Sequence, residues 1–233
     1  MEMKHKLKHI KLRCSNHGFT LIELMIALAV SLLALAAIYS TFLAQHKSYQ
    51  VQSEAADMQQ NIRAAMYYMQ REIRMAGSNP FKTLPLSSFG ITAAGSSSIT
   101  FTEDVRGINP TDGPDGNASE SDENITYQFD AVNRNLVRFD NTVVPPAGQI
   151  VARDIDALNF VYLDEDGNPT ATLADIRSVE ITIVARTKHS LLYGTKNNVY
   201  YKNQQGTTIF GPAGDNVSRR LLTTLIYCRN LGL

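Results

Sequence analysis

Hydrophobic positions are distributed unevenly along the chain, and the pattern changes abruptly at residue 19. Residues 1–18 are mainly basic and polar, whereas residues 24–44 contain no charged residue, glycine or proline. About 20 consecutive apolar residues are enough to cross a bilayer as an α-helix. We therefore predict a membrane-spanning helix over residues 19–44, whose apolar surface includes Leu21, Leu24, Ile26, Leu28, Val30, Leu32, Leu35, Ile38 and Phe42.

A helical pattern continues beyond this apolar segment, into residues 45–80. Gly77 followed by Pro80 is typical of a helix end. The pattern predicts one helix over residues 19–76, roughly 87 Å long at 1.5 Å per residue. Apolar positions recur every three or four residues, the spacing of a core-facing helix stripe, at Val51, Ala55, Met58, Ile62, Ala65, Met66, Met69, Ile73 and Ala76.

The remaining segment, residues 81–233, has the short alternating pattern of β-strands. Residues 106–123 and 187–216 are polar enough to predict long loops. We predict an α+β fold, in which the stripe of the long N-terminal helix covers one face of a C-terminal antiparallel sheet. The predicted strands are Ser98–Thr102, Asn124–Asp130, Asn135–Phe139, Gln149–Arg153, Ala157–Leu163, Ser178–Ala185 and Leu221–Cys228.

The charge balance changes the picture at the N-terminus. The whole chain has 22 basic and 22 acidic residues, but residues 1–18 hold five basic residues against Glu2 alone. Removing this segment leaves 17 basic and 21 acidic residues, a net charge of −4. Such a protein is not expected to carry a broad nucleic-acid-binding surface. The basic residues before the apolar segment predict that this end faces the cytoplasm and that the rest is periplasmic.

The junction between the two patterns, residues 18–23, reads GFTLIE. An ordinary secretory signal is cleaved at small residues after its apolar core, and no such site follows residue 44. The sequence instead offers a cleavable bond in front of the core, where Gly18 presents no Cβ to a protease; an uncleaved signal anchor is the alternative. A carboxylate such as Glu23 at the head of a span is costly and usually functional, the alternative being a side chain that snorkels to the interface.

Together with the segments on either side, this string resembles the processing site of type IV prepilins and type II secretion pseudopilins. The resemblance implies a leader, residues 1–18, that a prepilin peptidase removes between Gly18 and Phe19, and N-methylation of Phe19. It also implies that Glu23 pairs with the N-terminal amine of a neighbouring subunit and so selects the register of assembly. Residues 69–77 resemble the helix end of PilW-type minor pilins and related J-type pseudopilins, and residues 218–230 are similar to their last strand.

Other function classes find no support in the sequence. It contains no P-loop, dinucleotide-binding fingerprint, nucleophile elbow or Cys-x-x-Cys pair. His46, His189 and Cys228 are too few for a His/Cys zinc site. Residues 164–168 and 111–123 carry carboxylates of the kind that bind calcium, but a hairpin turn and a solvated acidic loop are the simpler interpretations. We therefore predict no enzymatic activity, no cofactor and no metal.

Cysteine usage is equally sparse. Removal of residues 1–18 also removes Cys14, so the mature chain keeps only Cys228 and forms no internal disulfide. Cys228 lies in an apolar run, which predicts a buried thiol.

Three functions remain open: a minor pilin that primes or caps a type IV pilus, a type II secretion pseudopilin, and a pilus-tip adhesin or DNA-uptake module. The absence of Gly and Pro from residues 19–76 favours a minor component. The resemblance implies as partners the prepilin peptidase, the major pilin, other minor pilins and the inner-membrane assembly platform. It places the protein in a bacterial inner membrane and then in a cell-surface pilus.

Overall fold

The computed structural model describes residues 18–82, 89–109, 112–146, 148–190 and 197–232. The predicted leader, apart from its last residue, lies outside these ranges. The chain divides into two compact units, Met1–Tyr49 and Gln50–Leu233. A single helix, α1 (Leu21–Ile73), contributes residues to both units.

In the first unit, α1 presents its apolar side chains without any cover. The nine residues predicted to line the membrane-spanning surface are all exposed, from 57% for Phe42 to 76% for Leu21. By length and composition α1 is able to cross a membrane, and its most apolar window has no buried residue. A surface this apolar is unfavourable in water and calls for lipid or a protein partner.

In the second unit, α1 buries one stripe. The helix ends at Ile73, slightly earlier than predicted, and residues 74–77 form turns. Gly77 has a φ of 81°, and a Cβ at this position would lie 2.8 Å from Cδ2 of Leu231. Glycine is therefore required at this helix end. The buried residues of the stripe are Met58, Ile62, Ala65, Met66, Met69, Ile73 and Ala76, whereas Val51 is exposed and Ala55 half-buried.

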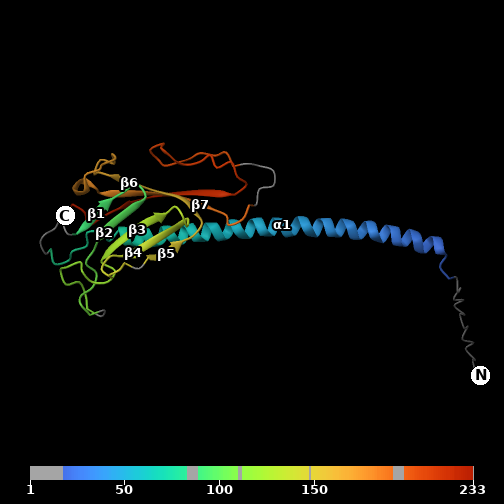
Figure 1. The fold of residues 1–233 in the computed structure, drawn as a ribbon, viewed down its shortest axis with the longest axis horizontal. Helices are drawn as coiled ribbons and strands as arrows, with labels where there is room; N and C mark the ends of the chain where they lie inside the picture. Colours follow the sequence, from blue (N-terminus) through green and yellow to red (C-terminus); the bar gives the residue numbers. More distant parts are fainter. Residues whose placement is uncertain (1–17, 83–88, 110–111, 147, 191–196, 233) are drawn as a thin grey trace, which may run out of the picture. The chain divides into compact units, whose positions relative to one another are not determined.

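The strands form two main antiparallel sheets instead of the single predicted sheet (Figure 1). The first has the order β1-β2-β3-β4-β5, and the second has the order β10-β7-β6. A small hairpin pairs β8 with β9. The strands are β1 (Gly90–Ala94), β2 (Ser98–Thr102), β3 (Asn124–Asp130), β4 (Asn135–Asp140), β5 (Gly148–Ala152), β6 (Ile155–Leu163), β7 (Ser178–Arg186), β8 (Tyr201–Lys202), β9 (Thr208–Phe210) and β10 (Arg219–Tyr227).

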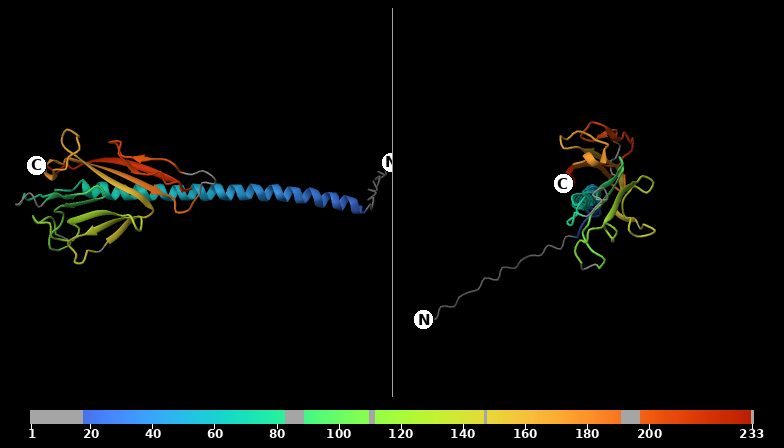
Figure 2. Two further views of the ribbon diagram at one scale, coloured as in Figure 1. Left: turned by 45° about the horizontal axis from the view of Figure 1, so that its top comes forward. Right: turned by 90° about the vertical axis from the view of Figure 1, so that its left-hand side faces the viewer.

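One hydrophobic core joins the helix to both sheets. Ile62 and Met69 of α1, Phe101 of β2, Tyr127 of β3 and Ile181 of β7 are all buried in the same cluster. Strands of both sheets lie along the C-terminal part of α1 (Figure 2). The prediction that the helix stripe packs on an antiparallel sheet is confirmed, with the difference that the stripe packs against two sheets.

Two strand regions were not predicted. β1 begins at Gly90, whose φ is 115°, and is short and rich in small residues. The predicted loop 187–216 contains the β8–β9 hairpin, whose strands are two and three residues long. Strands this short give too few alternating positions to be recognised from a sequence. Residues 112–123, in contrast, contain no regular strand or helix, as the polar pattern predicts.

Candidate processing and assembly site

Thr20 and Glu23 cap the start of α1. Leu24 donates its backbone N–H to the Thr20 carbonyl at 3.2 Å, which places Thr20 at the N-cap. Oε2 of Glu23 accepts hydrogen bonds from the backbone N–H and the hydroxyl of Thr20, both at 2.9 Å. The Glu23 N–H in turn donates to Oγ1 of Thr20 at 3.3 Å. This reciprocal arrangement is a capping box.

The capping box gives Glu23 a role that the sequence prediction did not include. Glu23 is the only acidic residue between positions 19 and 53, and its carboxylate stays exposed at the helix start. The N-terminal end of a helix carries partial positive charge, which favours a carboxylate there. Glu23 thus stabilises the helix start of a single chain, while its exposed carboxylate remains accessible to a cationic group from outside.

Gly18 and Phe19 precede the helix and make no packing contact that fixes their identity. A Cβ added to Gly18 would meet no heavy atom within 4 Å. Phe19 is 84% exposed. Neither residue is therefore explained by the fold of the described chain.

A polar network anchors the end of α1 on the five-stranded sheet. Tyr127 donates its hydroxyl to Oε2 of Glu72 at 2.6 Å, and Nε of Arg138 donates to the same atom at 3.0 Å. Arg138 also donates to Oδ1 of Asp122 at 2.9 Å. Burial, followed by the nearby charge of Glu72, raises the pKa of the Tyr127 phenol. These hydrogen bonds link α1 to β3, to β4 and to the loop before β3, which suits an anchor for the helix.

Glu103 lies beside this network in an unusual state for a carboxyl group. Glu103 is only 5% exposed, and its Oε2 atom is buried without a hydrogen-bond partner among the described residues. Burial and the neighbouring charge of Glu72 raise the pKa of Glu103 to about 8. At neutral pH the side chain is therefore mostly protonated. Sequence reasoning missed Glu72, Tyr127, Arg138 and Glu103, because they are brought together only by long-range packing.

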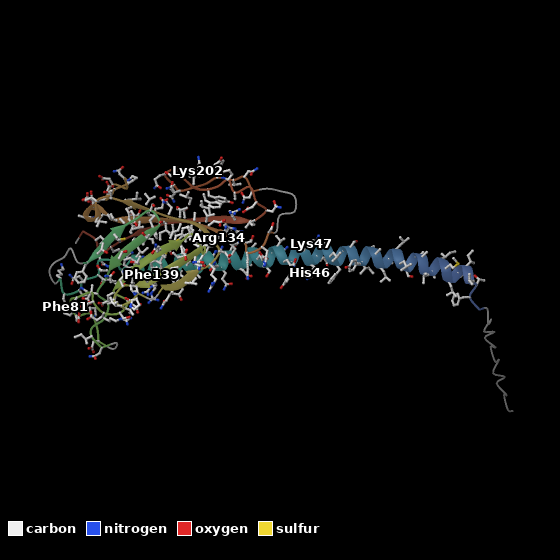
Figure 3. All side chains as sticks on the ribbon, in the orientation of Figure 1. His46, Lys47, Phe81, Arg134, Phe139 and Lys202 are labelled. Atoms are coloured by element: carbon white, nitrogen blue, oxygen red, sulfur yellow. The ribbon has the colours of Figure 1, made fainter. Side chains whose placement is uncertain are left out.

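A second contact ties α1 to the segment after β7. Nδ1 of His189 lies 2.6 Å from Oε1 of Glu54, and the His189 N–H donates to Oε2 at 3.1 Å. Although burial alone would raise the pKa of Glu54, these hydrogen bonds lower it. His46 lies elsewhere on α1, in the first unit (Figure 3).

Several of the carboxylates considered for calcium accept hydrogen bonds from the backbone. Asp164 accepts the N–H of Asn168 at 2.8 Å in a turn closed by Gly167, as the hairpin interpretation predicts. In the acidic loop, Glu123 accepts N–H groups of Val105, Arg106 and Glu120. Within the described ranges, no group of three or more His, Cys, Asp or Glu residues is placed to hold a metal ion.

Cys228 is buried, as predicted for a small apolar side chain in the last strand region. Burial raises the pKa of its thiol to about 12, so the reactive thiolate is not formed at neutral pH.

Comparison with known proteins supports the same reading of the N-terminus and fold. Residues 13–39 match the family model described as the prokaryotic N-terminal methylation motif. The structure is similar to the type IV-like pilin TTHA1219 from Thermus thermophilus, with 10% sequence identity and a TM-score of 0.51. The match covers 76% of this chain and 100% of that one. No curated protein sequence matches this chain.

Together, these findings give a pilin-like fold: one long N-terminal apolar helix joined to antiparallel sheets, carrying the prokaryotic methylation motif at its start. The motif and the apolar helix indicate membrane anchoring. Cleavage after Gly18, methylation of Phe19 and pairing of Glu23 with a neighbour remain predictions.

Proposed function

We propose that this type IV pilin-like protein is a minor pilin, a low-copy subunit that takes part in priming type IV pilus assembly near the tip. The observation that carries the proposal is the combination of the methylation motif over residues 13–39 with an apolar helix surface that nothing in the described chain covers. A subunit of this kind passes from lipid into a helical filament core, where other subunits replace lipid around the same surface.

In this proposal, each segment of the chain has its own role. Residues 1–18 are the leader, residues 19–44 the membrane and filament-core helix, residues 45–80 the amphipathic half, and residues 81–233 the head. The prepilin peptidase cuts after Gly18, Phe19 becomes the methylated N-terminus, and Glu23 meets the amine of the next subunit. The head faces the periplasm before assembly and the cell surface afterwards. We assign no catalytic role to the protein, since the pilin fold is that of a structural protein.

Two features favour a minor over a major subunit. The helix α1 runs unbroken from Leu21 to Ile73 and has no glycine or proline, so it lacks the residues at which helices unwind most readily. The head carries the irregular segment 112–123 and the β8–β9 hairpin, which a repeating filament would have to accommodate at every subunit. The resemblance of residues 69–77 to PilW-type minor pilins adds to this.

Deletion of the gene and counting of subunits test the proposal. We expect deletion to reduce surface pili strongly while the major pilin stays stable in the membrane, and expression in trans to restore piliation. Quantitative mass spectrometry of sheared pili should find this protein at a small fraction of the major pilin. A copy number similar to that of the major pilin would contradict a priming role. Normal piliation combined with loss of protein secretion would favour the pseudopilin alternative.

A further inference from the structure

Three arginines from distant parts of the chain meet at the edge of the three-stranded sheet. Arg219 of β10 and Arg186 of β7 lie directly opposite each other in the antiparallel register. Asp156 lies near the start of β6, at a shift in the register of its pairing with β7. Arg134, in the β3–β4 turn, reaches the same carboxylate from the other sheet. We call this group the arginine pocket.

Arg219 is fully committed to protein partners. Its Nε donates to Oδ2 of Asp156 at 2.5 Å, and Nη1 and Nη2 donate to the two oxygens of Asp215 at 2.5 and 2.6 Å. The guanidinium also lies 4.9 Å from the centre of the Phe210 ring. The side chain is 1% exposed, and its hydrogen bonds lower the pKa of Asp215 to about 2. This arginine builds the pocket, and its Nε, Nη1 and Nη2 atoms each donate to a protein partner.

Arg134 and Arg186 are not satisfied in the same way. Nε of Arg134 is 3.8 Å from Oδ1 of Asp156, and Nη1 of Arg186 is 3.6 Å from the same atom. Both distances exceed a hydrogen bond, and Nε of Arg186 donates to the Thr187 carbonyl oxygen at 3.5 Å. The Asp156 carboxylate is already engaged by Arg219, so three guanidinium groups share two carboxylates, Asp156 and Asp215. The cluster has one uncompensated positive charge.

These two guanidinium groups face a pocket of suitable size. The cavity has a volume of about 470 Å³, and its lining includes Arg134, Arg186 and Arg219, the acidic Asp156 and Asp215, and the apolar Phe129, Phe210 and Pro212. The Arg134 side chain is 52% exposed, so its donors are reachable from solvent, whereas that of Arg186 is 14% exposed. Partial burial reduces screening of the excess charge. The pocket therefore combines fork-shaped donors that form no hydrogen bond to a carboxylate with the apolar side chains of Phe129, Phe210 and Pro212.

We infer that the arginine pocket binds the carboxylate of a ligand, with Arg134 and Arg186 as donors and the rings and Pro212 against the ligand's carbon skeleton. The guanidinium fork matches a carboxylate in geometry and charge. The carboxylate comes either from a small organic acid, such as an acidic sugar, or from an acidic side chain. Binding of either kind goes beyond a purely structural role in the filament.

Isothermal titration of the mature full-length protein in detergent without sugar head groups tests the inference. The probes are sodium glucuronate for an acidic sugar and sodium N-acetylglutamate for an acidic side chain, with glucose, sodium phosphate and matched sodium chloride as references. We expect saturable binding of at least one carboxylate and none of glucose. Arg134→Gln should weaken this binding about tenfold or more. Arg134→Lys, which keeps the charge but loses the fork, should also weaken it.

Lys202→Gln is the matched control, because Lys202 is exposed on β8, does not line the cavity and carries the same charge (Figure 3). It should bind as the unmodified protein does, and circular dichroism should show that each variant is folded. Tighter binding of glucuronate would identify an acidic sugar as the source of the carboxylate, and tighter binding of N-acetylglutamate would identify an acidic side chain. Binding of phosphate alone, an equal heat in sodium chloride, or unchanged binding in Arg134→Gln would each overturn the inference.

Discussion

At the scale of single residues, Glu23 has one role in the structure and a second one in the proposed function. In the isolated chain it completes a capping box with Thr20. In a filament, the resemblance assigns it to the N-terminal amine of a neighbour. Glutamine retains the capping hydrogen bonds, because a capping box accepts either Glu or Gln at this position, but it carries no negative charge. The two roles are therefore separable by substitution.

We expect Glu23→Gln to insert into the membrane as well as the unmodified protein, since removing a charge makes insertion easier. Its incorporation into pili should fall several-fold, because the neighbour's ammonium group loses its ionic partner. The ratio of this protein in sheared pili to that in membranes measures the effect, with Thr20→Ala as the variant that weakens capping alone. If Glu23→Gln enters pili normally and Thr20→Ala does not, capping and not pairing is the function of Glu23.

Glu103 provides a second test at residue scale. The folded protein holds a proton on Glu103 up to about pH 8, whereas the unfolded chain releases it near pH 4.3. The folded state therefore binds more protons between these values, and the free energy of unfolding falls as pH rises through this window. The neighbouring charges are Glu72, Glu123, Arg138 and Arg71.

Glu103→Gln should remove this pH dependence and raise stability at pH 8, by an amount on the order of a few kcal/mol. Denaturant unfolding at several pH values between 4 and 8 measures it. The exposed Glu165→Gln is the control and should leave the slope unchanged. A Glu103→Gln protein with the same pH slope as the original would show that Glu103 is ionised in the folded state.

At the scale of elements, the burial of the apolar stripe on α1 differs along its length. Ile62 is 1% exposed within the core, whereas Val51 is 39% exposed. We expect Ile62→Ala to lower the free energy of unfolding by about 2–5 kcal/mol, because it leaves a cavity between the helix and the sheets. Val51→Ala should change it by no more than about 0.5 kcal/mol. Chemical denaturation followed by near-ultraviolet circular dichroism compares them, and equal losses would contradict the observed docking.

The elements also show what a sequence can predict. Seven strands and the helix were predicted because each offers several consecutive positions of one periodicity. β1 and the β8–β9 hairpin were missed because their strands are short, and β1 consists mainly of small residues. The arginine pocket could not be predicted, since Arg134, Arg186 and Arg219 acquire their relation only through the pairing of β7 with β10 and the approach of the β3–β4 turn. The division into two sheets likewise depends on strand pairing across long sequence separations.

At the scale of the whole molecule, the second unit has the properties of an independently folding domain. It contains the complete core, including Met58 to Ala76 of the helix stripe. We expect a shortened chain that starts at residue 46 to be soluble and monomeric and to show mixed α and β circular dichroism. Gel filtration and thermal unfolding test this, with the Ile62→Ala change as a destabilised reference. A purely helical spectrum or aggregation of the shortened chain would contradict it.

The first unit, unlike the second, has no core of its own among the described residues. Its apolar helix surface is exposed along the whole length of the described helix, which calls for lipid or a protein partner around it. The methylation motif lies at the start of this unit. In the proposed function, the leader has to be removed at this motif before the membrane-anchored chain can enter a filament. The proposed function therefore depends most on whether the bond between Gly18 and Phe19 is cleaved.

Intact-mass and N-terminal mass spectrometry of the protein purified from its own host's membranes tests this bond directly. We predict a mature chain that begins at Phe19 and carries one methyl group on its amine. In a host that lacks the prepilin peptidase, or in a Gly18→Glu variant, we predict the uncleaved chain with its basic leader. A mature protein that retains the leader in the normal host, or that begins at any residue other than Phe19, would contradict the account.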